Sequence, residues 1–396
     1  MNLNNSEFSM NQADRWLLPD GVEELLPPEA KQLEAMRRTL LDTYACWGYD
    51  LVLPPQLEYL ESLLTGVGSD LNLSTFKVTD QLTGRMMGVS ADITPQVARM
   101  DAHSWAKDGI TRLCYCGPVL HTRAQSLLSS RAPMQIGAEL FGESAPCADI
   151  ETLSLLVTSL KAAGLDKIHL DLGHVGIYKA LVSAAKLDCN TEAQIFDALN
   201  TKSVTEYRVL LTEKVPEQKL QAAFISLLSL NGGIEILDQA QDLAAVAQIA
   251  SPLANLKQIC TALQTRFPEV DIFIDLAELR GFDYHTGVVF AAYVEGHGQA
   301  VAQGGRYDDT GAVFGRSRAA TGFSADLKQW VKIITSEAPS QGGIFAPVGA
   351  DWSAVSELRS QGKRVINGLS STDTPAALGC TEQLASENGQ WIVKTV

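Results

Sequence analysis

Apolar side chains recur at three- and four-residue steps along residues 33–47. The stripe consists of Leu33, Met36, Leu40, Tyr44 and Trp47. This spacing predicts an amphipathic helix with one face against a core. Gly48 is suited to end that helix, because glycine readily adopts the left-handed conformation found at helix C-termini. Residues 49–53 then predict a short strand, which stops at two prolines that lack the N–H a sheet ladder needs.

Strand-like runs recur in two further parts of the chain. The runs cover residues 111–115, 135–141, 272–276, 287–294 and 299–302. Each is short and lies near glycines or other turn-forming residues, a pattern that favours strands. Gly304 and Gly305 predict a turn after the last run, and residues 325–334 predict a helix.

The segment 149–265 between these two groups has a different pattern. It is rich in Leu, Ala, Gln and Lys at helical spacing, with one expected strand at 168–172. Strands, a helical insertion and further strands predict an α+β domain on an antiparallel sheet, because the strict alternation of a dinucleotide-binding fold is missing. We expect a flexible N-terminus at 1–14, a core domain at 15–334, a linker at 335–343 and a small α/β domain at 344–396.

Composition narrows the class of protein. The chain has 396 residues, of which 46% are hydrophobic and 19% charged, so it can bury a large core in two or three domains. The net charge of −15 argues against nucleic acid as a partner, since nucleic-acid binders carry basic surfaces. The chain shows no signal-peptide pattern and no apolar run of the roughly 18 residues that a membrane span needs, so we expect a cytoplasmic protein.

The cysteines give no sign of a metal site. There are seven, scattered along the chain, and only Cys114 and Cys116 stand close together. No second pair has zinc-ligand spacing, so we expect reduced thiols, no metal and no cofactor.

Ordered sequence blocks carry a resemblance to a known family. The blocks are residues 21–30 with 47–49, 116–120 with 134–142, 280–290, 304–308 and 321–330. Over about 15–334 they resemble the signatures of class II aminoacyl-tRNA synthetases, and of the histidyl enzymes in particular. The resemblance implies an antiparallel sheet flanked by helices, and a dimer interface at the first block.

Within that superfamily, the chain most resembles a non-catalytic group. Residues 92–99 and 284–287 are similar to elements of the regulatory subunits of short-form ATP phosphoribosyltransferase, the first enzyme of histidine biosynthesis. The resemblance implies a homodimer that assembles with the short catalytic subunit and supports its activity. It also implies feedback inhibition by L-histidine, and no catalytic residue in this chain.

The resemblance further implies a pocket for free histidine. Its residues are Asp92, Thr94, Gln135, Glu139, Arg280, Tyr284 and His285. In the family pattern, Asp92, Thr94 and Gln135 meet the α-ammonium group, and Glu139 meets an imidazole N–H. Arg280 lies near the α-carboxylate, and Tyr284 forms part of the wall. Gln135 and Glu139 are four residues apart on an expected strand, so they share one side of the sheet.

These residues also have structural interpretations. Asp92 could cap the turn that follows it, and Glu139 and Arg280 could form an ordinary ion pair. Tyr284 could be a core residue. His285 replaces a tyrosine that is common in active synthetases, so a structural role for it stays open.

The expected nucleotide site departs from the catalytic pattern. Its residues are His121, Arg123, Asp326 and Gln329. His121 and Gln329 stand where catalytic relatives carry phosphate-binding arginines, and Arg123 replaces a glutamate. Asp326 replaces a glycine and adds a negative charge beside the expected phosphates. Because adenylation depends on cations at the reacting phosphate, this set predicts a lost reaction.

Three functions remain open on these observations. The first is the regulatory subunit. The second is an active histidyl-tRNA synthetase, which predicts histidine-dependent ATP–pyrophosphate exchange. The third is another histidine-sensing paralogue without a phosphoribosyltransferase partner. The nucleotide-site residues argue against the second, and a partner assay separates the first from the third.

Overall fold

The computed structural model describes residues 16–65, 69–124, 126, 129–240, 243, 246, 248–334 and 342–396. The expected flexible segment 1–14 and residues 335–341 of the expected linker lie outside the described residues. The chain forms two compact units, Met1–Thr335 and Ser336–Val396.

The first unit is built on a sheet whose described strands follow the order β1-β5-β6-β12-β11-β10-β7-β9-β8. The strands are β1 (Asp50–Leu51), β5 (Thr111–Pro118), β6 (Met134–Phe141), β7 (Ile168–His174), β8 (Asn231–Gly232), β9 (Asp271–Asp275), β10 (Val288–Val294), β11 (Ala302–Arg306) and β12 (Ala320–Asp326). Neighbouring strands are antiparallel except in the pairs β1–β5 and β7–β9. This arrangement confirms the predicted α+β class.

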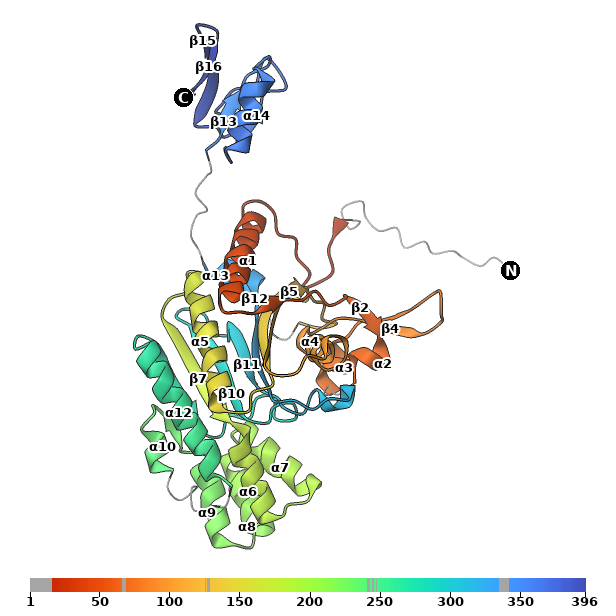
Figure 1. Cartoon of the computed structure of the whole chain (residues 1–396). Coiled ribbons are helices and arrows are strands. Elements are labelled where there is room, and N and C mark those ends of the chain that lie inside the picture. Colours follow the sequence, from red (N-terminus) through yellow and green to blue (C-terminus); the bar gives the residue numbers. More distant parts are fainter. Residues whose placement is uncertain are drawn as a thin grey trace, which may run out of the picture. The chain divides into compact units, whose positions relative to one another are not determined.

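One face of this sheet is covered by helices. They are α1 (Glu29–Cys46), α5 (Pro146–Ala162), α12 (Ala250–Arg266) and α13 (Leu327–Ile333). Figure 1 shows α5 and α12 lying side by side across the sheet, and α1 packs against α5 and α13. The large core between helices and sheet includes Leu40 of α1, Leu156 of α5 and Ile136 of β6.

Helix α1 forms where the apolar stripe predicts it. Its buried residues are Leu33, Met36, Leu40 and Tyr44, and Trp47 follows the helix and packs against the same core. Gly48 has a φ of +81°, and its N–H donates to the carbonyl of Ala45 at 3.0 Å. The glycine therefore ends the helix as predicted. The following strand β1 is shorter than the predicted 49–53.

The opposite face of the sheet carries a smaller core beneath helix α4 (Thr94–Arg99), which continues into a π-helix, η2 (Met100–Trp105). This core consists of Ile93, Val97, Ala98, Leu113, Tyr115, Val119, Phe141, Tyr307 and Ala320. Strand alternation separates the two faces, because Cys114 of β5 points into the large core and Tyr115 into the smaller one. The candidate site lies on this second face.

Two smaller substructures complete the first unit. A sheet of β2 (Leu57–Tyr59), β4 (Met86–Val89) and β3 (Lys77–Thr79) is accompanied by α2 (Leu60–Leu63) and α3 (Ser69–Ser74). A helical lobe contains α6 (Val175–Ala185), α7 (Cys189–Asn200), α8 (Val204–Lys214), α9 (Gln218–Ser226) and α10 (Ile236–Gln239). Figure 1 shows this lobe beyond one end of the sheet. It is narrower than the expected 149–265, because α5, β7 and α12 belong to the sheet and its helical layer.

Three predictions between 299 and 334 were wrong in detail. The strand predicted at 299–302 begins only at Ala302, and Gly304 and Gly305 lie inside it, between β10 and β12, rather than in a turn. A Cβ on Gly304 would meet the ring of Phe290 at 2.7 Å, so this glycine permits close packing. The helix predicted from 325 begins at Leu327, because Asp326 still belongs to β12.

The second unit is a small α/β structure. Its sheet has the strand order β14-β13-β15-β16. The elements are β13 (Ile344–Ala346), α14 (Trp352–Ser360), β14 (Val365–Asn367), β15 (Glu382–Glu387) and β16 (Gln390–Thr395). Val355 of α14 packs with Ile344 and Leu384 in a separate core.

Candidate functional site

Glu139 is the central polar group of the second sheet face, and it is only 1% exposed. The hydroxyl of Tyr115 donates to Oε1 of Glu139 at 3.1 Å, and the hydroxyl of Tyr307 donates to Oε2. Burial raises the pKa of Glu139 to about 8, although the Tyr307 hydrogen bond acts in the opposite direction. A carboxyl that titrates near neutrality is suited to a ligand that itself gains or loses a proton in this range.

Tyr284 forms a wall beside this carboxyl. Its ring stacks on that of Tyr307, with the centroids 5.0 Å apart and 25° between the planes. Thr310 lies near the buried hydroxyl of Tyr284, but the geometry is not that of a hydrogen bond. Within the described part of the chain, this hydroxyl has no hydrogen-bond partner. A buried hydroxyl without a partner costs about 1–3 kcal/mol, so this atom marks a place where a polar ligand group would be stabilised.

Asp92, Thr94 and Gln135 form a second polar cluster that connects to Glu139. The amide of Gln135 donates to Oδ1 of Asp92 at 2.8 Å, and the N–H of Thr94 donates to the same oxygen at 3.0 Å. The hydroxyl of Thr94 lies 2.9 Å from that of Tyr115, which in turn contacts Glu139. Asp92 therefore caps the turn before α4 and also holds Gln135, so its structural and ligand-binding roles are compatible.

Glycines provide the space for the buried side chains. Gly322 of β12 lies opposite Glu139 of β6, and a Cβ on Gly322 would overlap Oε2 of Glu139. A Cβ on Gly137 would strike the phenol of Tyr115. Tyr115, Tyr307 and Gly322 were not predicted from the sequence to be site residues. The available signal was that Tyr307 and Gly322 belong to the family-like blocks 304–308 and 321–330.

The structure does not bring Arg280 to Glu139. The guanidinium of Arg280 contacts the carboxylate of Glu278 at 3.4 Å and the hydroxyl of Tyr293 at 3.2 Å. The suggested ion pair between Glu139 and Arg280 is therefore wrong, because each group has other partners. Burial acts to lower the pKa of Arg280, but the charges of Glu278 and Asp171 and the contact with Tyr293 together outweigh it, so the net shift in the pKa is upward.

His285 faces the backbone of its own loop. Its Nδ1 lies 3.2 Å from the carbonyl oxygen of Arg280 and 3.1 Å from that of Gly281, so the tautomer protonated at Nδ1 donates to them. Burial lowers the pKa of His285 to about 4. These contacts favour a structural role for His285 in shaping the loop that carries Tyr284.

Two side chains expected at the nucleotide site, Asp326 and Gln329, form hydrogen bonds within the protein. Asp326 accepts hydrogen bonds from the N–H groups of Lys328 and Met134, both at 3.0 Å, and so caps α13. Burial raises the pKa of Asp326. The amide of Gln329 lies 2.8 Å from Nε2 of His297 and donates to the carbonyl of Ala300 at 3.2 Å.

The loop after β5 is also held by hydrogen bonds within the protein. Nε2 of His121 lies 2.9 Å from the carbonyl oxygen of Ala91, and Arg123 is exposed to solvent. Arg131 donates to the carbonyl of His121 at 3.1 Å and to that of Asp20 at 2.9 Å. This cation therefore holds the N-terminal segment instead of presenting its charge to a ligand.

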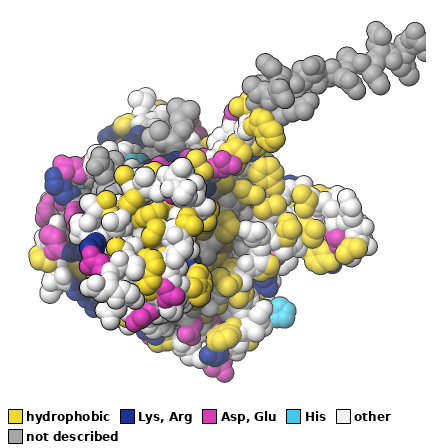
Figure 2. Space-filling view, turned by 90° about the horizontal axis from the view of Figure 1, so that it is seen from above, with side chains coloured by type: hydrophobic (Ala, Val, Ile, Leu, Met, Phe, Trp, Pro, Cys, Tyr) yellow, Lys and Arg dark blue, Asp and Glu magenta, His cyan; other side chains and the backbone are white. Residues whose placement is uncertain are grey.

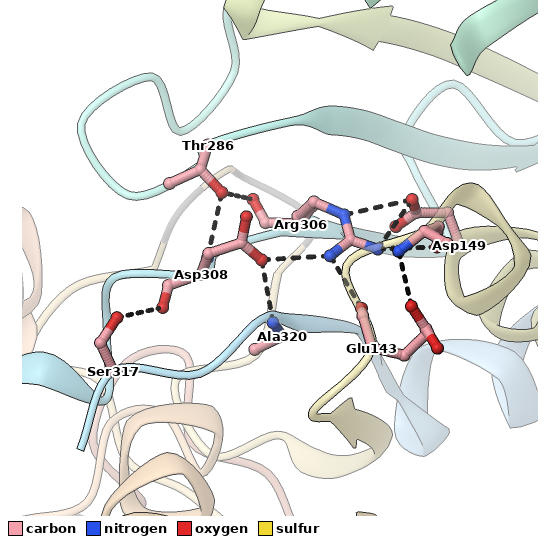
Figure 3. A network of polar contacts seen from close by, with 8 residues as sticks. Glu143, Asp149, Thr286, Arg306, Asp308, Ser317 and Ala320 are labelled. Atoms are coloured by element: carbon pink, nitrogen blue, oxygen red, sulfur yellow. Dashed lines mark hydrogen bonds and ion pairs between the residues drawn. The ribbon is translucent and has the colours of Figure 1, made fainter. Parts of the chain in front are cut away.

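A network of ion pairs and hydrogen bonds fixes the end of β11 next to Tyr307 (Figure 3). It consists of Glu143, Asp149, Thr286, Arg306, Asp308 and Ala320. Arg306 donates to Oδ2 of Asp149 at 2.9 Å and to Oδ1 of Asp308 at 3.1 Å. Because Tyr307 lies between Arg306 and Asp308 in the chain, this network sets the position from which its phenol reaches Glu139.

The described residues contain neither a metal-binding cluster nor a membrane-spanning helix. In these ranges, no group of three or more His, Cys, Asp or Glu side chains is arranged to hold a metal ion. None of the helices described is both long and apolar enough to cross a bilayer.

The chain is similar to known proteins over nearly its whole length. A family model described as histidyl-tRNA synthetase matches residues 21–330, and one described as the C-terminal domain of ATP phosphoribosyltransferase subunit HisZ matches 341–394. Proteins named ATP phosphoribosyltransferase regulatory subunit are 52% identical in Thioalkalivibrio sulfidiphilus and 51% in Pseudomonas aeruginosa. Each alignment covers 97% of this chain and 99% of the relative.

Solved structures show the same fold. A regulatory subunit/histidyl-tRNA synthetase from Bacillus halodurans superposes with a TM-score of 0.80 at 26% identity, covering 91% of this chain and 95% of that one. A chain of the HisG:HisZ complex from Thermotoga maritima superposes with a TM-score of 0.59 at 18% identity. That match covers 77% of this chain and 98% of the other, and it shows likeness of fold alone.

Proposed function

Because this chain belongs to the family of ATP phosphoribosyltransferase regulatory subunits, we propose that it binds the short catalytic subunit of that enzyme and controls it in response to L-histidine. The chain is the regulatory and not the catalytic component. The catalytic subunit depends on it for full activity, and histidine, the end product of the pathway, inhibits the assembly through it.

The observation that carries this proposal is the buried carboxyl of Glu139 among phenols. Imidazole has an ordinary pKa of about 6.5, and a carboxyl with a pKa of about 8 can share a proton with it. The unsatisfied hydroxyl of Tyr284 offers a further polar contact beside Glu139. In this proposal, Asp92 meets the α-ammonium group, and Arg280, which contacts Glu278 in this structure, meets the α-carboxylate.

Inhibition requires that histidine bind the less active state of the assembly more tightly than the active state. A coupling free energy of about 1–3 kcal/mol is typical, which corresponds to roughly a 5- to 150-fold difference in affinity. A mixing assay tests the function. Adding this chain to the catalytic subunit should raise its turnover, and histidine should then lower it. Unchanged turnover across a range of mixing ratios would end the proposal.

The pocket residues can be tested in the same assay. Glu139→Gln keeps the shape of the side chain but removes the ionisable oxygen, so histidine inhibition should weaken by at least tenfold in concentration while assembly is kept. Glu213→Gln, an exposed position on α8, is the matched control and should leave inhibition unchanged. If Glu139→Gln lost inhibition and assembly equally, Glu139 would have a structural role and not a role in histidine binding.

We also propose that the chain does not adenylate histidine. Asp326 and Gln329 are both engaged in protein hydrogen bonds, and Asp326 places a carboxylate where a nucleotide would bring phosphates. Measuring histidine-dependent ATP–pyrophosphate exchange on the purified chain separates this proposal from the alternative of an active histidyl-tRNA synthetase. The expected result is no exchange above background, and exchange at synthetase rates would support the alternative.

The functional unit proposed is a homodimer formed through the N-terminal part of the first unit. Exposed apolar side chains there are Trp16, Leu17, Leu18, Leu26, Leu51, Leu53 and Leu57. Figure 2 shows hydrophobic side chains gathered on the face where the described chain begins. Apolar surface of this kind marks protein interfaces. A histidine sensor without a phosphoribosyltransferase partner would form such a dimer too, but it would not retain the catalytic subunit in a pull-down.

A further inference from the structure

One segment of the chain connects the buried Glu139–Tyr307 contact to the protein surface. Residues 306–320 leave β11, form the short 3-10 helix η3 (Ala312–Phe314) and return as β12. At its start, the buried phenol of Tyr307 donates to Glu139, and the N–H of Tyr307 donates to the carbonyl of Ala320 at 2.8 Å. Because this backbone hydrogen bond joins the two ends of the segment, a displacement of Tyr307 would also displace Ala320.

The far end of the segment is held by a second buried contact. Arg318 donates to both carboxylate oxygens of Asp101, at 2.7 and 2.9 Å, and these side chains are 8% and 2% exposed. Asp101 belongs to the π-helix η2, which continues α4. The two phenols on Glu139 are thus connected to the Asp101–Arg318 pair by separate routes. Tyr115 contacts the hydroxyl of Thr94, the first residue of α4, which continues into η2 and Asp101. Tyr307 begins the segment that carries Arg318.

The two segments that meet at this pair, and the turns beside them, also carry exposed apolar side chains. We define the Trp105 surface by Trp105, Ile110 and Val313, which are 46%, 49% and 50% exposed. Arg316, near η3, pairs with Asp108 in the turn that follows η2, at 2.7 Å. π-helices are rare and occur frequently at functional sites, and η2 ends at Ala106 with a left-handed φ of 45°.

The carboxyl of Glu139 is closed off in this structure. Each oxygen accepts a phenol, and the group is only 1% exposed, so a ligand N–H can approach it only if a neighbouring side chain moves aside. Tyr115 is held by a second contact with Thr94. Among the described residues, the hydroxyl of Tyr307 has Glu139 as its only partner. Of the two phenols, Tyr307 is therefore the one that a ligand would displace from Glu139.

We propose that Tyr307 is the positioning residue through which a ligand at Glu139 acts on the rest of the protein. The ligand N–H takes the place of the Tyr307 hydroxyl, the 306–320 segment shifts, and the Asp101–Arg318 pair transmits the shift to the Trp105 surface. The inference rests on the proposed function, because it takes L-histidine as the ligand.

Two quantities measured on the assembled enzyme test the inference. They are the histidine concentration for half-maximal inhibition, which reports binding, and the residual activity at saturating histidine, which reports transmission. Tyr307→Phe keeps the ring that stacks on Tyr284 and removes the hydroxyl. We expect it to bind histidine by calorimetry, yet to keep at least half of its histidine-free activity at saturation. The matched control Tyr207→Phe removes a buried tyrosine hydroxyl in the helical lobe, where it donates to the carbonyl of Phe224 at 3.0 Å. It should show a residual activity within about twofold of the unmodified protein.

A second variant acts away from the pocket. Asp101→Asn keeps the size of the side chain and removes the charge that holds Arg318. It should leave the half-maximal concentration within about threefold while raising the residual activity as Tyr307→Phe does, and it decides the question if Tyr307→Phe fails to fold. Full inhibition of both variants at saturating histidine would overturn the inference. An unmodified assembly that neither binds histidine nor is inhibited by it would refute the proposed function as well.

Discussion

Glu139 on β6 lies directly opposite Gly322 on β12, and the missing side chain at Gly322 leaves the space that the Glu139 carboxyl occupies. The two residues are far apart in the sequence and adjacent only through strand pairing. A buried carboxyl can be kept here because the neighbouring strand contributes no Cβ at that point and two phenols satisfy its oxygens.

Gly322→Ala should therefore displace the Glu139 carboxyl. A methyl group at this position overlaps Oε2, and overpacking of a buried site costs typically about 1–3 kcal/mol. We expect histidine affinity to fall at least tenfold by calorimetry, with a lower unfolding temperature. Gly298→Ala is the control, because a Cβ there meets open space. Unchanged affinity in Gly322→Ala would mean that the ligand does not bind at Glu139.

The raised pKa of Glu139 predicts a dependence of stability on pH. Its pKa is about 8 in the folded protein against 4.5 as the ordinary value. Between these values the folded state keeps a proton that the unfolded state has lost. The contribution of Glu139 to stability is therefore greatest below pH 4.5 and declines as pH rises toward 8, by up to about 1.4 kcal/mol per pH unit.

Glu139→Gln removes this titration. As pH rises from 5 to 8, the unfolding free energy of the unmodified protein should thus fall relative to that of Glu139→Gln. His285 and His174, whose pKa values burial lowers to about 4, have the opposite effect, since their contribution is lost as pH falls from 6.5 to 4. They are present in both proteins and cancel in the difference. Parallel pH profiles would show that Glu139 does not titrate in this range.

Asp326→Gly restores the glycine of the catalytic pattern and tests what the aspartate does here. Two N–H groups, of Lys328 and Met134, lose their acceptor, so we expect a loss of about 1–2 kcal/mol in chemical denaturation. Asp351→Gly removes the exposed cap of α14 and should cost only a few tenths of a kcal/mol. Calorimetry should detect no gain of ATP binding, because Gln329 stays bonded to Ala300. Tight ATP binding by Asp326→Gly would mean that one substitution had closed the nucleotide site.

Leu53→Glu should separate the proposed homodimer into monomers. Leu53 is 74% exposed in the isolated chain, and a buried unpaired charge in an apolar interface is strongly unfavourable. Light scattering after gel filtration measures the mass directly. Leu369→Glu, at a 91% exposed position of the second unit, serves as the control and should leave the mass unchanged. A dimer that survives Leu53→Glu would place the interface elsewhere.

Much of the fold follows from local patterns in the chain. The stripe from Leu33 to Tyr44 predicts α1, because apolar residues at helical spacing lie on one face of a helix and that face is the one that becomes buried. The family-like blocks place Glu139 and Gln135 together on one strand, where alternation gives them a common face. The turn predicted at Gly304 was wrong, because glycine is favoured both in turns and where two strands pack closely.

The sequence by itself determined the class of fold, the main helix and the strand that carries Glu139, since these depend on residues a few positions apart. Only the tertiary structure decided what surrounds that carboxyl. Tyr307 is 168 residues away along the chain, and it reaches Glu139 because the pairing of β6 with β12 and of β12 with β11 sets which side chains face each other. A shift of one residue in either pairing would turn the side chains to the other face, so the surroundings of Glu139 depend on a strand register that local spacing does not encode.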